Sequence, residues 1–222
     1  MGSHLCDKLI EREDQVICID NLLTGNIDNI THLQANPNFQ FVEADTIEKF
    51  PQDLDFDCLY HLASPASPNK NNPKSYQALP FETMQVNTLG TWNLCNEAAL
   101  RGAKFLFAST SETYGEPLEH PQKEQYRGNV STTGPRSVYD ESKRFGETVT
   151  AAFVRHNKLD ARIVRIFNTY GPRMAPDGRV VIEFVTAALQ NKPFPVFGDG
   201  KQTRSFCYVS DLVDGIIAVM EK

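Results

Sequence analysis

The sequence predicts an α/β protein, built as a doubly wound parallel sheet with helices on both faces. Two observations carry this prediction. Apolar runs of strand length alternate along the 222 residues with longer stretches of helical periodicity, and this alternation is typical of βαβ units. Acidic or polar residues stand at the carboxyl ends of several runs, among them Asp20, Asp45, Ser111 and Asn168. In a parallel sheet that edge is where ligands bind.

The expected strands are short runs rich in Val, Ile, Phe and Tyr, which suit a pleated, buried surface. They span residues 15–20, 38–45, 57–63, 104–108, 161–167, 195–197 and 205–209. The expected helices carry apolar residues three or four positions apart, as Leu5 and Leu9 do. They span residues 3–12, 27–35, 81–101, 137–156, 180–190 and 211–222. Loops are expected at 64–80, 114–134 and 168–178, and the first is long enough to suggest function.

Composition excludes several classes of function. The net charge of −6 comes with no Lys- or Arg-rich run, which argues against nucleic-acid binding. No apolar stretch approaches the roughly 18 residues that a membrane span needs, and no secretory signal is visible. The five cysteines form no Cys-x-x-Cys pair and the five histidines show no ligand spacing. We therefore expect a cytoplasmic protein with reduced thiols, no membrane contact and no metal.

Tyr139 and Lys143 are the most informative pair. They stand four residues apart on the expected helix 137–156, so they share one face of it. An ammonium beside a phenol favours the phenolate and lowers the Tyr pKa, and such a phenolate can take a proton from an alcohol. The spacing alone also occurs on plain helix surfaces. Its value comes from Ser111 and Glu112, which follow the expected strand 104–108.

These residues lie in segments that resemble the extended short-chain dehydrogenase/reductases acting on nucleotide sugars, and most closely the UDP-glucuronate decarboxylases among them. The segments are 2–5, 19–21 with 24–25, 61–67, 86–91, 109–115, 134–144, 165–174, 177–180 and 198–204. They cover nearly the whole chain in the right order. The resemblance implies a Rossmann-type sheet, NAD as cofactor, a UDP-sugar substrate, and a homodimer formed through the helices at 81–101 and 137–156.

The resemblance also implies what the chain lacks. The family opens with a strand and a Gly-x-x-Gly-x-x-Gly loop, whose third glycine corresponds to Gly2. We therefore expect a chain truncated at both ends, without the first strand, and with unpaired edges on the two strands that would flank it. The expected division is 1–167 for NAD binding and 168–222 for a partial substrate-binding region interleaved with the last Rossmann elements. Glu13 and Gln85 also depart from the family, at positions where a helix-ending Gly and a Lys are usual.

Five residues are expected to be catalytic by resemblance. They are Tyr139, Lys143, Ser111, Glu112 and Arg204. Tyr139 is the expected base at the sugar 4-hydroxyl, Lys143 holds the nicotinamide ribose, and Arg204 lies near the glucuronate and the pyrophosphate. Ser111 stands where the related 4,6-dehydratases carry an Asp that protonates a leaving hydroxyl. Because loss of CO2 needs no such acid, Ser fits decarboxylation better.

The remaining site residues are binding candidates. For the cofactor they are Gly2, Asp20, Asn21, Leu23, Thr24, Gly25, Asp45, Thr46, Leu62, Ser64, Thr169 and Arg179, together with Tyr139 and Lys143. For the substrate they are Asn93, Asn168, Val181, Gln202 and Arg204. An acid at position 20 suits the ribose hydroxyls of NAD and repels the 2′-phosphate of NADP.

The function implied is NAD-dependent conversion of UDP-glucuronate to UDP-xylose and CO2 through a 4-keto sugar. Two alternatives stay open. One is another nucleotide-sugar enzyme, a 4,6-dehydratase or a 4-epimerase. The other is a catalytically inactive, truncated nucleotide-sugar-binding remnant, and for the 222 residues alone we expect little or no activity.

Overall fold

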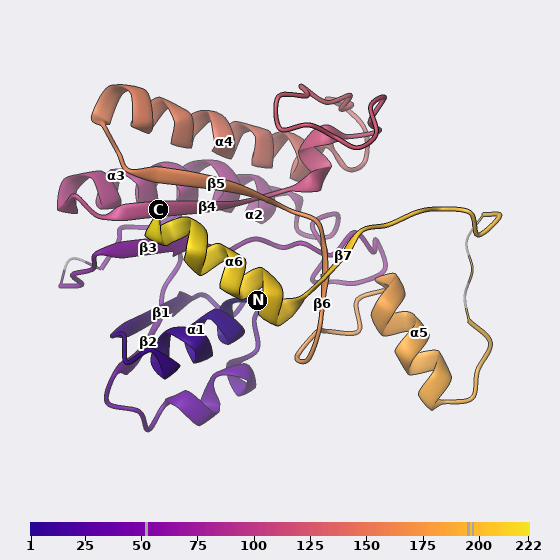
Figure 1. Ribbon diagram of the computed structural model, residues 1–222, viewed down its shortest axis with the longest axis horizontal. Coiled ribbons are helices and arrows are strands. Elements are labelled where there is room, and N and C mark those ends of the chain that lie inside the picture. Colours follow the sequence, from indigo (N-terminus) through magenta and orange to yellow (C-terminus); the bar gives the residue numbers. More distant parts are fainter. Residues whose placement is uncertain (52, 195, 197) are drawn as a thin grey trace.

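The structure is a computed structural model that describes the whole chain except residues 52, 195 and 197 (Figure 1). The strand expected at 195–197 therefore lies largely outside the described residues. No helix in the described part is long and apolar enough to cross a membrane.

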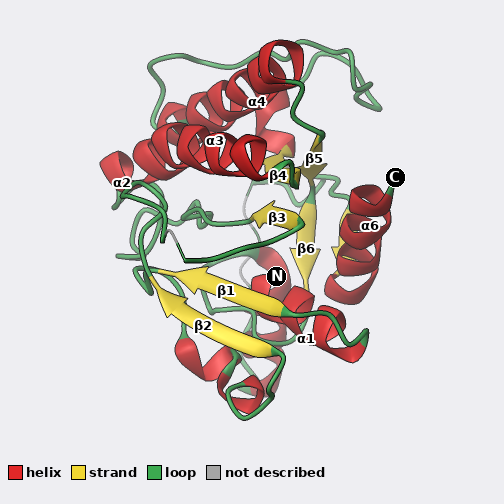
Figure 2. Cartoon of the chain, turned by 90° about the vertical axis from the view of Figure 1, so that its left-hand side faces the viewer, coloured by secondary structure: helices red, strands yellow, loops and turns green. Residues whose placement is uncertain are grey.

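The described strands pair only in parallel, in three separate groups. The first is β1 (Val16–Asp20) with β2 (Phe39–Glu43), and the second is β3 (Cys58–His61), β4 (Lys104–Thr110) and β5 (Ala161–Ile166) in that order. The third is β6 (Asn168–Tyr170) with β7 (Phe206–Tyr208). The predicted Rossmann-like parallel α/β fold is confirmed. In Figure 2 β1 and β2 lie apart from β3, and among the described residues no strand pairing joins the two groups.

The helices lie close to their predicted positions. They are α1 (Gly2–Glu11), α2 (Pro80–Gln85), α3 (Thr91–Arg101), α4 (Ser137–Asn157), α5 (Val180–Leu189) and α6 (Val209–Glu221). The single helix expected at 81–101 is interrupted by a π-helical segment at Val86–Gly90, and Gly102 ends α3 with a φ of 65°. The helix expected at 27–35 is two short 3₁₀ turns, Ile27–Asn29 and Thr31–Leu33. The loop expected at 168–178 begins instead with the short strand β6.

Strand β4 lies between two apolar clusters, one on each face of the sheet. Phe105 and Phe107 are fully buried against α3 and α4, in a cluster with Leu94, Cys95, Val149 and Phe153. Leu106 points the other way, into a cluster with Leu5 of α1 and Val213, Ile216 and Met220 of α6. Alternation along the strand therefore supplies both cores, and burying each large side chain contributes about 1.5–3 kcal/mol. Figure 1 has α3 and α4 on one side of β4 and α6 on the other.

Candidate active site and cofactor pocket

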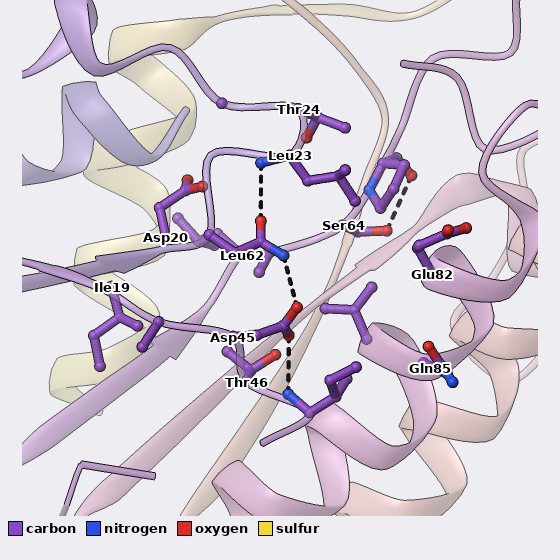
Figure 3. A pocket seen from close by; sticks show the side chains of 17 residues that line it. Ile19, Asp20, Leu23, Thr24, Asp45, Thr46, Leu62, Ser64, Glu82 and Gln85 are labelled. Atoms are coloured by element: carbon purple, nitrogen blue, oxygen red, sulfur yellow. Dashed lines mark hydrogen bonds between the residues drawn. The ribbon is translucent and has the colours of Figure 1, made fainter. Parts of the chain in front are cut away.

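A pocket of about 180 Å³ lies at the carboxyl ends of β1, β2 and β3 (Figure 3). Most of the residues predicted to bind the cofactor line it, namely Asp20, Asn21, Leu23, Thr24, Gly25, Asp45, Thr46, Leu62 and Ser64. Parallel strands place their carboxyl ends at one edge of the sheet, which is why residues far apart in the sequence meet here.

The two acids of this pocket are held by the loops that follow their strands. The Asp20 carboxylate accepts a hydrogen bond of 2.7 Å from the backbone N–H of Leu22. A β-carbon at Gly25 would lie 2.9 Å from the Oδ1 atom of Asp20, so a larger residue at this position would displace the Asp20 carboxylate. Asp45 accepts 2.8 Å and 3.1 Å hydrogen bonds from the Asn21 side chain and the Ile47 backbone, drawn in Figure 3.

The pocket offers donors and acceptors suited to a ribose. Two carboxylates and the Ser64 hydroxyl line it, and the Thr46 hydroxyl is buried without a hydrogen-bond partner among the described residues. Carboxylates of this kind accept hydrogen bonds from vicinal hydroxyls, as in dinucleotide sites. The residues present therefore fit the adenosine half of a dinucleotide.

Tyr139 lies in the first turn of α4, buried to 8% exposure. Its ring stacks on that of Tyr76, with centroids 4.8 Å apart and planes at 9°. Burial raises the pKa of Tyr139 to about 12, against a hydrogen bond with the Thr110 side chain that acts to lower it. The prediction of a lowered Tyr139 pKa is wrong for this structure, because desolvation of the phenolate is the largest effect.

Lys143 shares the helix face with Tyr139, as the spacing predicted, but its ammonium is engaged elsewhere. The Nζ atom donates a 2.7 Å hydrogen bond to the carbonyl oxygen of Ala108 and lies 6.0 Å from the centre of the Tyr139 ring. The side chain is 2% exposed, and burial lowers the pKa of Lys143 to about 7. Lys143 is therefore only partly protonated near neutral pH, which weakens its effect on the phenol.

Ser111 and Glu112 begin the 3₁₀ turn Ser111–Tyr114 directly after β4. The Thr110 hydroxyl caps this turn by accepting a 3.2 Å hydrogen bond from the N–H of Glu112. The Glu112 carboxylate forms an ion pair with Arg136, the residue that precedes α4. The turn thus brings Glu112 to the same end of α4 as Tyr139.

The other predicted residues are more dispersed. Arg204 is exposed and donates a 2.7 Å hydrogen bond to the carbonyl of Thr203, and among the described contacts none joins it to Tyr139. Asn93 of α3 donates hydrogen bonds of 3.1 Å and 3.2 Å to the Thr46 and Ile47 carbonyls, so it supports the pocket wall.

The remaining predicted residues lie on separate elements. Asn168 and Thr169 belong to β6, Val181 belongs to α5, Gly2 begins α1, and Gln202 lies in the exposed segment before β7. Arg179 precedes α5 and forms a two-point ion pair with the buried Asp177 at 2.8 Å and 3.0 Å. Its charge acts to lower the pKa of Tyr139.

Three residues near Tyr139 were not predicted to belong to the site, namely Tyr76, Thr110 and Arg136. Tyr76 comes from the loop at 64–80, whose length had suggested function. Arg136 lies within the segment 134–144 that carries the family resemblance. Neither the loop length nor the family segment indicates that Tyr76 would reach Tyr139 or that Arg136 would reach Glu112. These contacts depend on how the loop packs against the first turn of α4.

All of the chain, residues 1–222, matches the NAD dependent epimerase/dehydratase family. The chain belongs to this family. The family membership expected from the motifs is therefore confirmed.

Two of the similar proteins are named UDP-glucuronic acid decarboxylases. UDP-glucuronic acid decarboxylase 1 of Arabidopsis thaliana is 53% identical over 222 residues, which cover 100% of this chain and 49% of the relative. UDP-glucuronic acid decarboxylase 1 of Xenopus tropicalis is 46% identical over 221 residues, 99% of this chain and 51% of the relative. The chain thus spans about half the length of these relatives.

Solved structures with the same fold include enzymes of other names. DesIV, a dTDP-glucose 4,6-dehydratase from Streptomyces venezuelae solved with NAD and TYD bound, has a TM-score of 0.85 and 28% identity, covering 100% of this chain and 69% of that one. The UDP-glucuronic acid 4-epimerase of Bacillus cereus, solved with UDP-glucuronic acid and NAD, has a TM-score of 0.76 and 29% identity, covering 100% and 70%.

Proposed function

We propose that the protein is an NAD-dependent decarboxylase that converts UDP-glucuronate to UDP-xylose and CO2. The observation that carries the proposal is the Ser111-Glu112 pair at the end of β4, which directly follows Thr110, the residue whose side chain forms a hydrogen bond with the buried Tyr139. A hydroxyl at position 111 cannot protonate a leaving group near neutral pH, whereas loss of CO2 requires no such acid. The 53% identity to a protein named UDP-glucuronic acid decarboxylase 1 supports the same reaction.

NAD is the proposed cofactor, with its adenosine ribose against Asp20 and its adenine end near Asp45. The pocket chemistry described above supports this fit, and the acid at position 20 favours NAD over NADP. When bound, NAD supplies the redox chemistry by accepting a hydride from the sugar and returning it. Thr24 and Ser64 would orient the cofactor through their hydroxyls.

The chain's own residues handle the proton and the developing charge. Oxidation at C4 makes the sugar a β-keto acid, so the C5–C6 bond can break with its electron pair passing into the ketone as an enolate. Tyr139, with a pKa of about 12, is protonated near neutral pH and can donate a hydrogen bond to that enolate. Removing the 4-hydroxyl proton requires the phenolate, which is favoured if the Lys143 ammonium leaves the Ala108 carbonyl for the phenol oxygen.

The test combines binding and turnover. The purified chain is titrated with NAD by calorimetry and incubated separately with UDP-glucuronate and with UDP-glucose, and the products are identified by mass spectrometry. Little turnover is expected of the 222 residues alone, so any product should be UDP-xylose formed slowly from UDP-glucuronate, with no change in UDP-glucose and with the residual turnover lost in Tyr139→Phe. Consumption of UDP-glucose supports the dehydratase or epimerase alternative, and binding without turnover supports the inactive, nucleotide-sugar-binding alternative.

We also propose that two copies associate through α3 and α4. Large apolar side chains on these helices and the segment before them are exposed, with Phe81 at 70%, Trp92 at 54% and Phe145 at 52%. Exposed apolar patches of this kind mark interfaces. In a two-fold dimer the same patch on each copy packs against the other. Analytical ultracentrifugation should give a dimer for the unaltered chain and a monomer for Phe145→Glu. A monomeric unaltered chain contradicts the proposal.

A further inference from the structure

Cys6 and Cys18 place two thiol groups in contact from different elements. Cys6 lies in α1 and is 8% exposed, whereas Cys18 lies in β1 and is half-buried. Their side chains share a hydrogen bond, and both belong to the apolar cluster that also contains Val16, Leu33 and Phe39. The contact meets the first requirement for a disulfide, which is that the two side chains point toward each other.

The other three cysteines have different surroundings in the part of the chain that the structure describes. The Cys95 thiol lies 4.0 Å from the Thr150 hydroxyl, and the Cys207 thiol donates a 3.5 Å hydrogen bond to the Tyr208 carbonyl. Cys58 is exposed in β3. Cys58 therefore serves as an accessible thiol with which the pair can be compared.

The two thiols of the pair differ in reactivity. The hydrogen bond with Cys6 lowers the pKa of Cys18, because it stabilises the Cys18 thiolate, and the same bond raises the pKa of Cys6. The thiolate is the nucleophile in thiol–disulfide exchange. Cys18 is also the more exposed of the two, so it is the better nucleophile for an oxidant that arrives from solvent.

The place of the pair matters because α1 connects two parts of the molecule. Strands β1 and β2 pair only with each other among the described residues, and α1 packs beside β1 (Figure 2). On its other side, Leu5 of α1 packs into the cluster of α6, and Lys8 forms a 3.4 Å ion pair with Asp214 of α6. A bond from Cys6 to Cys18 would therefore fasten β1 to the helix that links it to the rest of the fold.

We infer that Cys6 and Cys18 form a reversible redox site, at which a small-molecule disulfide such as oxidised glutathione converts the two thiols into a disulfide that clamps α1 to β1. In the first step the Cys18 thiolate attacks one sulfur of the oxidant. A mixed disulfide forms, and one glutathione thiolate leaves and takes up the proton that Cys18 had lost. The Cys6 sulfur then loses its proton and attacks the Cys18 sulfur, and the second glutathione leaves and takes up that proton. Two protein thiols are thus oxidised to one disulfide, while one glutathione disulfide is reduced to two thiols.

The clamp has a structural consequence. It closes the short loop of residues 6–18 and so restricts the unfolded chain, which favours the folded state. Because β1 ends at Asp20, the clamp also fixes the strand that carries this acid of the cofactor pocket. Neither step involves the nucleotide sugar, so the inference and the proposed function can fail separately.

The test detects the bond and its effect on stability. The unaltered chain, Cys6→Ala, Cys18→Ala and the control Cys58→Ala are incubated with oxidised glutathione, blocked with N-ethylmaleimide and digested with trypsin without reduction. Mass spectrometry should find residues 1–8 linked to residues 13–49 in the unaltered chain and in Cys58→Ala. Cys6→Ala should instead accumulate Cys18 as a mixed disulfide with glutathione, because the resolving thiol is absent.

Thermal unfolding of the same samples measures the clamp. We expect the unfolding temperature of the unaltered chain to rise on oxidation by about 5 °C and to return after dithiothreitol. The rise should persist in Cys58→Ala and be absent in Cys6→Ala and Cys18→Ala.

Two results contradict the inference, and both are read on the unaltered chain, so neither depends on a variant that folds. If Cys58 is glutathionylated while the linked peptide is absent, the pair is not a redox site. If the linked peptide forms without a rise in the unfolding temperature, the disulfide does not act as a clamp.

Discussion

The rings of Tyr76 and Tyr139 stack at 4.8 Å, nearly parallel. The first comes from the loop at 64–80 and the second from α4, and both are buried. The stack therefore ties a long loop, which also supplies Ser64 and Pro65 to the cofactor pocket, to the helix that carries the proposed acid–base residue. Offset-stacked aromatic pairs contribute about 0.5–1.5 kcal/mol beyond the area they bury.

Two substitutions of Tyr76 should distinguish the contribution of its ring to stability from that of its hydroxyl. Tyr76→Ala removes a fully buried ring, and we expect the free energy of unfolding to fall by about 3–5 kcal/mol. Tyr76→Phe keeps the stack and removes only the hydroxyl, which interacts with the Arg136 and Gln77 side chains, so its effect should stay within about 1 kcal/mol. Urea unfolding measures both. Equal losses for Ala and Phe would show that the hydroxyl, rather than the stack, is responsible.

The buried Lys143 should make stability depend on pH in the alkaline range. Its pKa in the folded chain is about 7, against an ordinary value of 10.5. Between these values the unfolded chain binds one more proton at this residue, so the free energy of unfolding rises with pH from about 7 towards 10, by roughly 1.4 kcal/mol per pH unit. Below pH 7 the residue adds no further dependence.

Lys143→Met is the matched control for that prediction, because it keeps an unbranched side chain of similar length and cannot titrate. Urea unfolding of both proteins at pH 7, 8 and 9 cancels the contribution of every other group. The difference between them should change steadily with pH. Parallel curves would mean that Lys143 is solvated in the folded chain.

Gly146 lies where α4 packs closely against Phe107 of β4 and the backbone of Asn87. A β-carbon there would lie 2.4 Å from Cζ of Phe107 and 2.8 Å from the carbonyl oxygen of Asn87. We expect Gly146→Ala to lower the free energy of unfolding by about 1–3 kcal/mol through overpacking. Gly215 in α6 is exposed with open space around it, so Gly215→Ala should raise stability by about 0.5–1 kcal/mol. A stabilising Gly146→Ala contradicts this account.

Glu13 ends α1 in a conformation that suits glycine, with a φ of 66°. The N–H groups of Glu13 and Asp14 donate to the Ile10 and Leu9 carbonyls at 3.0 Å and 3.1 Å, which is the Schellman pattern. Glu13→Gly should therefore raise the free energy of unfolding by about 1 kcal/mol. Glu11→Gly, inside the helix, should lower it by a similar amount, and thermal melts of the two variants decide between these signs.

Most strands and helices could be predicted because their signals are local. The alternation that buries Phe105, Leu106 and Phe107 is visible in the sequence, as is the periodicity of α4. The exceptions are segments whose form depends on packing. The π-helical segment at Val86–Gly90 and the short strand β6 have no local pattern of their own, and β6 exists because β7 pairs with it from 38 residues further along the chain.

The cofactor pocket was also predictable, since Asp20 and Asp45 stand at strand ends whatever the details of packing. Contacts between distant segments were not. The identity of Tyr139 and its spacing from Lys143 can be read from the sequence, but the pKa of each depends on burial, which in turn depends on what packs around them. The same holds for Arg136, which reaches Glu112 only because a turn after β4 and the start of α4 meet in space. Residue order supplies the chemical groups, and long-range packing sets their solvation and their partners, because both depend on atoms distant in sequence.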